Sequence, residues 1–153
     1  MKKTILNSPI YIATAETECW KCNNIMKTTA IIAPNMVGDD EDFEDGGVGI
    51  LLEVTFLPEF LLKKIQALNP NYQLRYSKSI EGKYYANVCP HCNVISGDFF
   101  LHSEPGSAFF PTSVEEAKQI KLKKIELNEA IEVEASYSLG LGEFILENGN
   151  IKE

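Results

Sequence analysis

The residues of this sequence with the clearest chemical potential are its four cysteines. Cys19 and Cys22 lie in the segment Glu-Cys-Trp-Lys-Cys-Asn, and Cys89 and Cys92 lie in Val-Cys-Pro-His-Cys-Asn. Residues 23–88 separate the two Cys-x-x-Cys pairs, and an asparagine directly follows each pair. Two such pairs supply four thiolates, which form the ligand set of a tetrahedral zinc site. The spacing therefore predicts one zinc ion bound by all four cysteines.

The asparagines that follow the pairs, Asn23 and Asn93, have a physical explanation. A chain that wraps two sulfur atoms around one metal ion turns tightly, which pushes the residue after the second cysteine toward positive φ. Glycine adopts positive φ most easily, and asparagine comes next. Both segments resemble the knuckles of zinc-ribbon and rubredoxin-like domains, whose usual form is Cys-Pro-x-Cys-Gly. The resemblance covers the two knuckles and their flanks, and it implies a metal site and a local fold rather than an activity.

Thiol redox chemistry is the main alternative for the second pair. The Cys-Pro-His-Cys segment at residues 89–92 matches the active site of strongly oxidising thioredoxin-fold enzymes, whose first cysteine has a pKa lowered by a helix N-terminus. Here two β-branched residues and a glycine follow within residues 93–97, and these continue poorly as a helix. A redox site would also leave the first pair unexplained, and two disulfides would require an oxidising compartment.

The ligand count favours a structural role for the zinc ion. Four cysteines fill the coordination sphere, whereas a catalytic zinc site keeps one position open. The only two histidines are His91, which is expected to point outward from the second knuckle, and His102, which is expected at the surface or in a loop. No Gly-rich phosphate loop, Gly-x-Ser-x-Gly or His-Glu-x-x-His pattern is present. We therefore expect a protein that is not an enzyme.

The charge of the chain is concentrated in one segment. The 153 residues carry a net charge of −8, and six of the 22 carboxylates lie in residues 39–45. We expect residues 38–49 to form a flexible acidic loop, because like charges repel and glycine adds chain entropy. The acidic balance disfavours nucleic-acid binding, which needs a basic face. A local cluster of lysines in residues 118–124 keeps a zinc-ribbon nucleic-acid accessory protein as an alternative.

The apolar segments are too short to cross a membrane. The start of the chain superficially has the form of a signal peptide, but the polar and broken stretch Asn7-Ser8-Pro9 interrupts its apolar region. Free thiolates that bind metal also fit a reducing compartment. We therefore expect a cytoplasmic protein.

The residues around each knuckle read as β-strands. Residues 9–15 and 26–33 alternate and are rich in β-forming residues, so they predict a hairpin around the first knuckle. Residues 84–88 and 94–95 flank the second knuckle in the same way. The zinc module is thus expected to comprise about residues 9–33 and 84–97 within a single domain of residues 1–153.

Other segments complete the expected fold, which is α+β with mostly antiparallel strands, two or three short helices and an embedded four-cysteine zinc-ribbon-like module. Residues 48–56 predict a buried strand, and Pro58 opens a helix whose leucines and isoleucine lie on one face. A short helix is expected after residue 112 because of overlapping capping boxes. Residues 120–127 and 131–137 predict a hairpin with its turn at Asn128-Glu129, and residues 141–151 a last strand.

A binding function through protein–protein contacts follows as the leading hypothesis. The acidic charge makes an inhibitor or immunity-type protein with a basic partner one concrete form. The candidate contacts are aromatic residues near the two knuckles, which zinc would bring together, although burial in the core is the expected fate of most phenylalanines. These residues are Trp20, Phe99, Phe100, Phe109 and Phe110.

Overall fold

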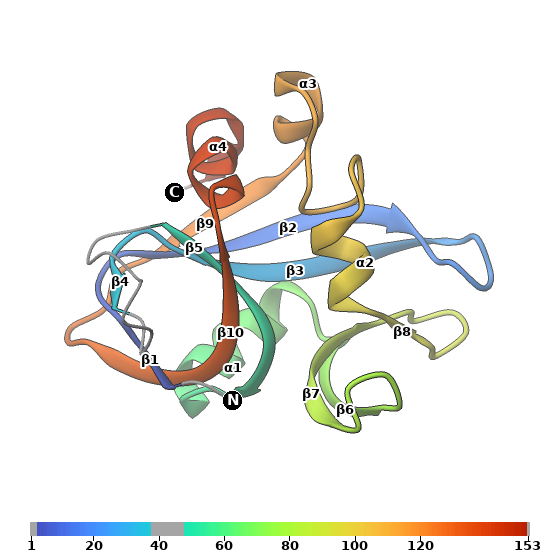
Figure 1. Ribbon diagram of the computed structural model, residues 1–153, viewed down its shortest axis with the longest axis horizontal. Coiled ribbons are helices and arrows are strands. Elements are labelled where there is room, and N and C mark those ends of the chain that lie inside the picture. The colour runs from blue at the N-terminus through green and yellow to red at the C-terminus, as the bar shows by residue number, and fades with distance from the viewer. Residues whose placement is uncertain (1–2, 38–47, 153) are drawn as a thin grey trace.

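The computed structural model describes residues 3–37 and 48–152, and it confirms an α+β fold that consists mostly of antiparallel strands (Figure 1). Its four helices exceed the two or three that the sequence predicts. The elements in chain order are β1 (Lys3–Leu6), β2 (Ile10–Glu18), β3 (Ile25–Ala33), β4 (Met36–Val37), β5 (Gly49–Phe56), α1 (Glu59–Leu68), β6 (Tyr72–Ser77), β7 (Gly82–Val88), β8 (Ile95–Ser96), α2 (Asp98–Ser103), α3 (Val114–Ala117), β9 (Lys121–Ile125), β10 (Ile131–Leu139), α4 (Leu141–Asn148) and β11 (Asn150–Lys152).

The larger of two sheets is strongly curved. In the described part of the chain it has eight strands in the order β11-β9-β2-β3-β5-β10-β1-β4, and only the β11–β9 pair among them is parallel. β1 lies four places from β2, which corresponds to about 19 Å across a flat sheet at about 4.8 Å per strand. The chain from Leu6 to Ile10 spans at most about 14 Å. The sheet must therefore curl, and Figure 1 shows β5 and β10 bending around toward β1.

Apolar residues are buried on both faces of this sheet. Ile31 and Ile32 are adjacent in β3 and point to opposite faces, as the two-residue period of a strand requires. On the concave side, Leu61 and Ile65 of α1 pack against residues of β2, β3 and β10. On the other side, Ile145 of α4 packs against β3, β5 and β9. Two helices thus cover the two faces, and the helical face predicted after Pro58 is confirmed.

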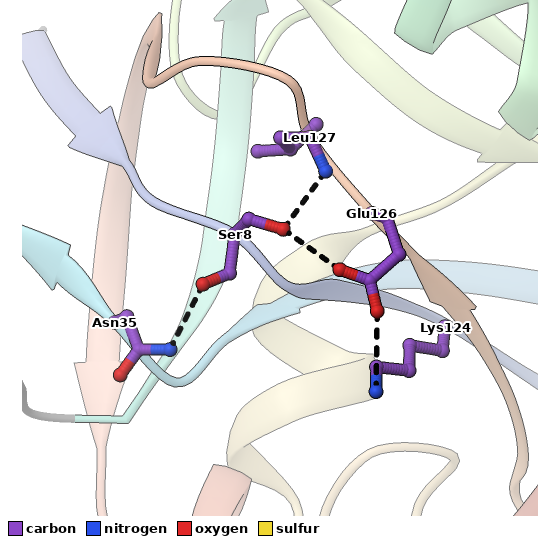
Figure 2. Close-up of polar contacts among 5 residues, drawn as sticks. All are labelled: Ser8, Asn35, Lys124, Glu126 and Leu127. Atoms are coloured by element: carbon purple, nitrogen blue, oxygen red, sulfur yellow. Dashed lines mark hydrogen bonds and ion pairs between the residues drawn. The ribbon is translucent and has the colours of Figure 1, made fainter.

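The hairpin predicted around Asn128-Glu129 is wrong. β9 pairs with β2 and β11, whereas β10 pairs with β1 and β5. The connection instead crosses one end of the curved sheet, where Ser8 holds it (Figure 2). The Ser8 hydroxyl donates to Oε2 of Glu126 at 3.1 Å and accepts from the backbone N–H of Leu127 at 2.8 Å. Lys124 forms an ion pair with the same Glu126 carboxylate at 3.2 Å.

The tail is also different from the prediction. Residues 141–148 form α4 rather than a strand, and only residues 150–152 add a short strand beside β9. Gly140 has a φ of 100°, a conformation that favours glycine, and this turn directs the chain out of β10 and into the helix. Residues 98–103 form a further helix, α2, for which the sequence analysis predicts no element.

Two further expectations concern the acidic segment and the membrane. Residues 38–47 of the predicted acidic loop lie outside the described residues, and Gly49, the last residue of that segment, begins β5. Across the part of the chain that the structure describes, no helix combines the length and the apolar character that a membrane crossing requires.

Candidate metal centre

The two knuckles come from different sheets. The first is the turn of the β2–β3 hairpin, which belongs to the larger sheet and whose last pair is Glu18 with Ile25. The second is the turn between β7 and β8 of the smaller sheet, which has the order β6-β7-β8. Figure 1 shows both hairpin ends on the same side of the molecule, at the right of the view. The two knuckles therefore meet at the junction of the two sheets.

Each knuckle has the same backbone hydrogen bonds. In the first, the N–H of Cys19 donates to the carbonyl of Asn24 at 2.8 Å, and the N–H of Asn23 donates to the carbonyl of Cys19 at 3.0 Å. Corresponding bonds of 2.9 Å hold the second knuckle. Asn23 has a φ of 63° and Asn93 a φ of 66°. The prediction of positive φ at both asparagines is thus confirmed.

The four sulfur atoms lie close enough together to hold a metal ion. All four Sγ atoms are within 4.8 Å of one another. The closest pairs join the two knuckles, with 3.5 Å between the sulfurs of Cys19 and Cys92 and 3.7 Å between those of Cys22 and Cys89. Cys19 and Cys89 are fully buried, whereas Cys22 and Cys92 are partly exposed. The four predicted ligands therefore form one cluster rather than two separate pairs.

Backbone amides favour ionisation of the first pair. The pKa of Cys22 is lowered to about 6, because the backbone N–H and the side-chain amide of Asn24 both donate to its sulfur. The pKa of Cys19 is lowered mainly by the backbone N–H of Cys22. Burial raises the pKa of Cys92 to about 12 in the absence of a cation. A bound cation would offset that burial, since metal ligation requires thiolates.

Two side chains connect the knuckles to their surroundings. Nε1 of Trp20 in the first knuckle donates to the carbonyl of Ile95 in β8 at 2.8 Å, which ties the first hairpin to the smaller sheet. The guanidinium of Arg75 in β6 donates to Oδ1 of Asn93 at 3.1 Å and to its carbonyl at 3.2 Å. Sequence analysis missed Arg75, because nothing in a strand residue far from the knuckle indicates this contact.

A buried amide cluster joins the two sheets further along the same strands. Oδ1 of Asn87 accepts from the N–H of Thr29 at 2.8 Å, and Nδ2 of Asn87 donates to the carbonyl of Thr29 at 3.0 Å. The side chain therefore pairs with β3 in the way that a neighbouring strand would. Nδ2 of Asn69, at the end of α1, donates to the Thr29 hydroxyl at 3.1 Å and to the carbonyl of Lys27 at 3.2 Å.

The predicted aromatic contact residues have different environments. Trp20 is 61% exposed, whereas Phe109 is fully buried among the core residues of the α4 side and cannot contribute to a surface. Phe110 is partly buried, and the side chains of Phe99 and Phe100 in α2 lie outside the described part of the structure.

The two histidines also differ in their exposure to solvent. His91 is exposed at the second knuckle, as expected. His102 is buried against Phe109, which corrects the expectation of a surface or loop position. Burial lowers the pKa of His102 to about 4, and its Nδ1 atom has no hydrogen-bond partner among the described residues. The buried position follows from the helix α2, which the sequence analysis did not predict.

The fold and the cysteine cluster together define the class of the molecule. It is an α+β protein in which four cysteines at the junction of two sheets could hold a metal ion. Comparisons with protein-family models, with curated proteins and with solved structures each found no match.

Proposed function

We propose that this chain is a zinc-stabilised protein-binding module that is not an enzyme. The observation that carries the proposal is the arrangement of the four sulfur atoms. A tetrahedral site with Zn–S bonds of about 2.3 Å has S–S edges of about 3.8 Å, and the two closest pairs here are 3.5 and 3.7 Å apart. A site with only thiolate ligands favours zinc over the harder divalent cations. Four protein ligands leave no open position for a substrate.

In this proposal the zinc ion holds the first hairpin against the smaller sheet. The two knuckles are far apart in the sequence, so four metal–sulfur bonds would fix the relative position of two elements with limited apolar contact at this point. The small apolar cluster around the cysteines contains Met26 and Val94 as its main additional members. The zinc ion would thereby stabilise a surface that includes the exposed ring of Trp20.

The main alternative, a thiol–disulfide oxidoreductase at Cys89 and Cys92, has less support. The second knuckle leads into the strand β8 rather than into a helix, so the feature that lowers the pKa of the reactive cysteine in such enzymes is absent from these described residues. The suggestion that the partner is basic is based on the net charge of the chain. Most of the acidic segment lies outside the described residues, so its structure adds no support.

Metal analysis tests the zinc part of the proposal. Freshly purified protein should contain one zinc ion per chain with four sulfur ligands, measured by elemental analysis and X-ray absorption. Cys22→Ser and Cys92→Ser should both lose the metal, because each removes one ligand of a shared site. A metal-free protein with four titratable thiols and an unchanged fold would contradict the proposal. Reduction of insulin that depends on Cys89 would support the oxidoreductase instead.

Crosslinking in the source cells tests the binding part. The tagged chain should form a specific crosslinked complex with a protein, and Trp20→Ser should reduce its yield if the surface beside the first knuckle takes part. The protein-binding part would be contradicted if the zinc-loaded chain formed only the complexes that a tagged control protein also forms.

A further inference from the structure

β2 extends beyond the strand that pairs with its outer edge. β3 pairs with β2 from Tyr11 to Glu18, whereas β9 pairs with β2 only from Ile10 to Thr14. In the described part of the chain, no strand pairs with the other edge of residues 15–18. Figure 1 shows this part of β2 continuing toward the hairpin end that carries the first knuckle. An unpaired edge presents backbone N–H and C=O groups that another strand can bind.

The direction of these backbone groups follows from the hydrogen bonds around them. Both the N–H and the carbonyl of Cys19 bond within the knuckle, on the side of β3, and the carbonyl of Ala15 accepts from the Thr28 hydroxyl of β3 at 2.8 Å. Successive residues of a strand direct their backbone groups to alternate sides. Because the β2–β3 register is continuous, Glu16 and Glu18 direct their N–H and C=O groups toward the unpaired edge.

A cavity of about 750 Å³ lies at this edge. Its floor is formed by residues 14–17 of β2, and its two walls lie on opposite faces of the sheet. One wall contains Lys27, Lys121 and Lys123 together with the carboxylate of Glu16, so it has three basic groups and one acidic group. These side chains share a face because Lys27 is opposite Glu16 and the other two lysines are opposite Thr14 and Ile12. The other wall contains small and apolar residues, among them Ala108 and the largely buried Ile120, and it also includes the polar side chains of Glu116 and Gln119.

The charge of the first wall is available to a ligand. Lys121 and Lys123 are exposed and form no ion pair with another described residue. Lys27 donates a hydrogen bond to the carbonyl of Leu68 at 3.0 Å. On the opposite wall, the carboxylate of Glu116 accepts hydrogen bonds from Thr112. A protein with a net charge of −8 thus has a basic wall beside an open strand edge.

We propose that this edge binds an extended segment of a partner protein by strand addition, and that the segment alternates carboxylate and apolar side chains. A bound strand directs its side chains alternately to the two walls. The carboxylates would then face the three lysines, and the apolar side chains would face Ala108 and Ile120. The proposal deepens the proposed function, because it assumes that the partner is a protein, and it assigns a chemical class to that partner.

The direct test uses the full, zinc-loaded chain and a fluorescein-labelled peptide of alternating glutamate and valine. Fluorescence anisotropy should show saturable binding. A peptide of the same composition, in which all the glutamates precede the valines, should bind about tenfold more weakly or less, because it cannot supply both walls at once. Lys121→Glu combined with Lys123→Glu should weaken binding of the alternating peptide by at least about tenfold, because it reverses two charges of the basic wall.

Proline at position 16 tests strand addition directly. Glu16→Pro removes an N–H that faces the unpaired edge and leaves the β2–β3 hydrogen bonds in place, so it should abolish binding while the fold and the zinc content are retained. Glu16→Thr is the matched control, because it removes the same carboxylate, keeps the N–H and should bind the peptide at least as tightly as the unaltered chain.

The proposal would be overturned by equal binding of the two peptides or by undiminished binding of the Glu16→Pro chain. Equally tight binding of oligothymidylate would also overturn it, because that result would indicate a general polyanion surface. Zinc content is measured on every sample before binding. A zinc-loaded chain that binds no peptide therefore contradicts strand addition alone, whereas a chain without zinc contradicts the proposed function.

Discussion

At the scale of single residues, both knuckle asparagines adopt a positive φ, and the side chain of one of them also accepts a hydrogen bond. Asn23 and Asn93 occupy the left-handed region, which β-branched residues adopt only with strain. The side chain of Asn93 also accepts a hydrogen bond from Arg75, whereas the side chain of Asn23 is exposed. Asn23 is therefore the cleaner position at which to test the conformational requirement.

Substitution of Asn23 should separate conformation from side-chain chemistry. Asn23→Gly should keep the zinc affinity of the unaltered chain, while Asn23→Val should lower it by about tenfold, which corresponds to about 1–2 kcal/mol of backbone strain. Competition with a chromogenic chelator measures both affinities. Equal affinities for the glycine and valine variants would show that φ at this position does not matter to the site.

The structural role of Asn87, whose side chain joins the two sheets, can be tested by a nearly isosteric substitution. Asn87→Asp replaces the amide that donates to the carbonyl of Thr29 by an oxygen, and it buries a carboxylate that is only 1% exposed. We expect a loss of about 2 kcal/mol or more in the free energy of unfolding, measured by denaturant titration. Gln119→Glu, the same change at an exposed position, should stay within about 0.5 kcal/mol. Similar effects for the two variants would contradict a specific role for Asn87.

These residues also show what the sequence could and could not reveal. The cysteines and the asparagines after them were predictable because their signal is local: the ligand spacing and the tight turn lie within a few residues. Asn87 gave no such signal, because its partner Thr29 is brought to it only by the docking of the two sheets. Arg75 was missed for the same reason.

At the scale of elements, the short helix α2 carries two buried titratable groups with opposite effects. Oδ2 of Asp98 accepts from the N–H of Glu53 at 2.7 Å, at a bulge of β5 where Glu53 has a φ of 48°. Burial raises the pKa of Asp98 from 3.8 to about 7, and burial lowers the pKa of His102 from 6.5 to about 4. Both side chains are therefore mostly neutral in the folded protein between about pH 4 and pH 7.

The two shifts oppose each other as the pH changes. Between about pH 4 and 7 the folded chain holds a proton on Asp98 that the unfolded chain has lost, so this contribution to stability falls as the pH rises. Between about pH 4 and 6.5 the unfolded chain holds a proton on its histidine that the folded chain excludes, so this contribution falls as the pH drops. Together they flatten the dependence of stability on pH.

Asp98→Asn should remove one of these contributions and expose the other. The amide oxygen still accepts from the Glu53 N–H, but no buried charge forms at alkaline pH. Denaturant titrations should show the variant more stable than the unaltered chain near pH 8, with an advantage that shrinks as the pH falls toward about 5.5. Zinc-loaded proteins are compared at each pH so that the cysteines contribute equally. A difference that is constant with pH would contradict the assignment.

The positions of the strands in the sequence were predicted better than the pairing of the strands in the sheet. The patterns of apolar and β-forming residues, a mostly apolar run in the case of β5, located β2, β3, β5, β7, β9 and β10, because each of these strands buries one or both faces. It does not identify which strand lies beside which, and residues 120–127 and 131–137 were therefore paired as a hairpin although three strands separate them in the sheet. α4 was missed because its eight residues depend on packing against β5 and on the turn at Gly140.

At the scale of the whole molecule, the candidate metal centre lies at one end of the junction between two sheets, while most of the apolar core lies elsewhere. The two main core clusters contain no residue of the knuckles, and the cysteine cluster is separate from both. The curved sheet with α1 and α4 should therefore persist without metal, and the loss of metal should act on the junction.

Removal of zinc with a chelator should accordingly loosen one region only. Hydrogen exchange should increase at the end of the β2–β3 hairpin and in β7 and β8, while amides of β5, β10 and α1 stay protected. Hydrogen–deuterium exchange read by mass spectrometry, with and without chelator, measures this difference. Uniform loss of protection across the chain would show that the metal supports the whole fold rather than the junction.

The pairing of β1 and β2 has a consequence for how the chain is made. β1 pairs with β10 and the outer edge of β2 pairs with β9, and both partners are synthesised more than a hundred residues later. Contacts between residues so distant in the sequence are slow to form, because a long loop must close first. Until residue 139 has emerged, the β2–β3 hairpin has an open outer edge and β1 lacks its main neighbour. Completion of the curved sheet is therefore expected only after residue 139 has been synthesised, and chaperones that bind exposed strands could bind β1 and β2 before then.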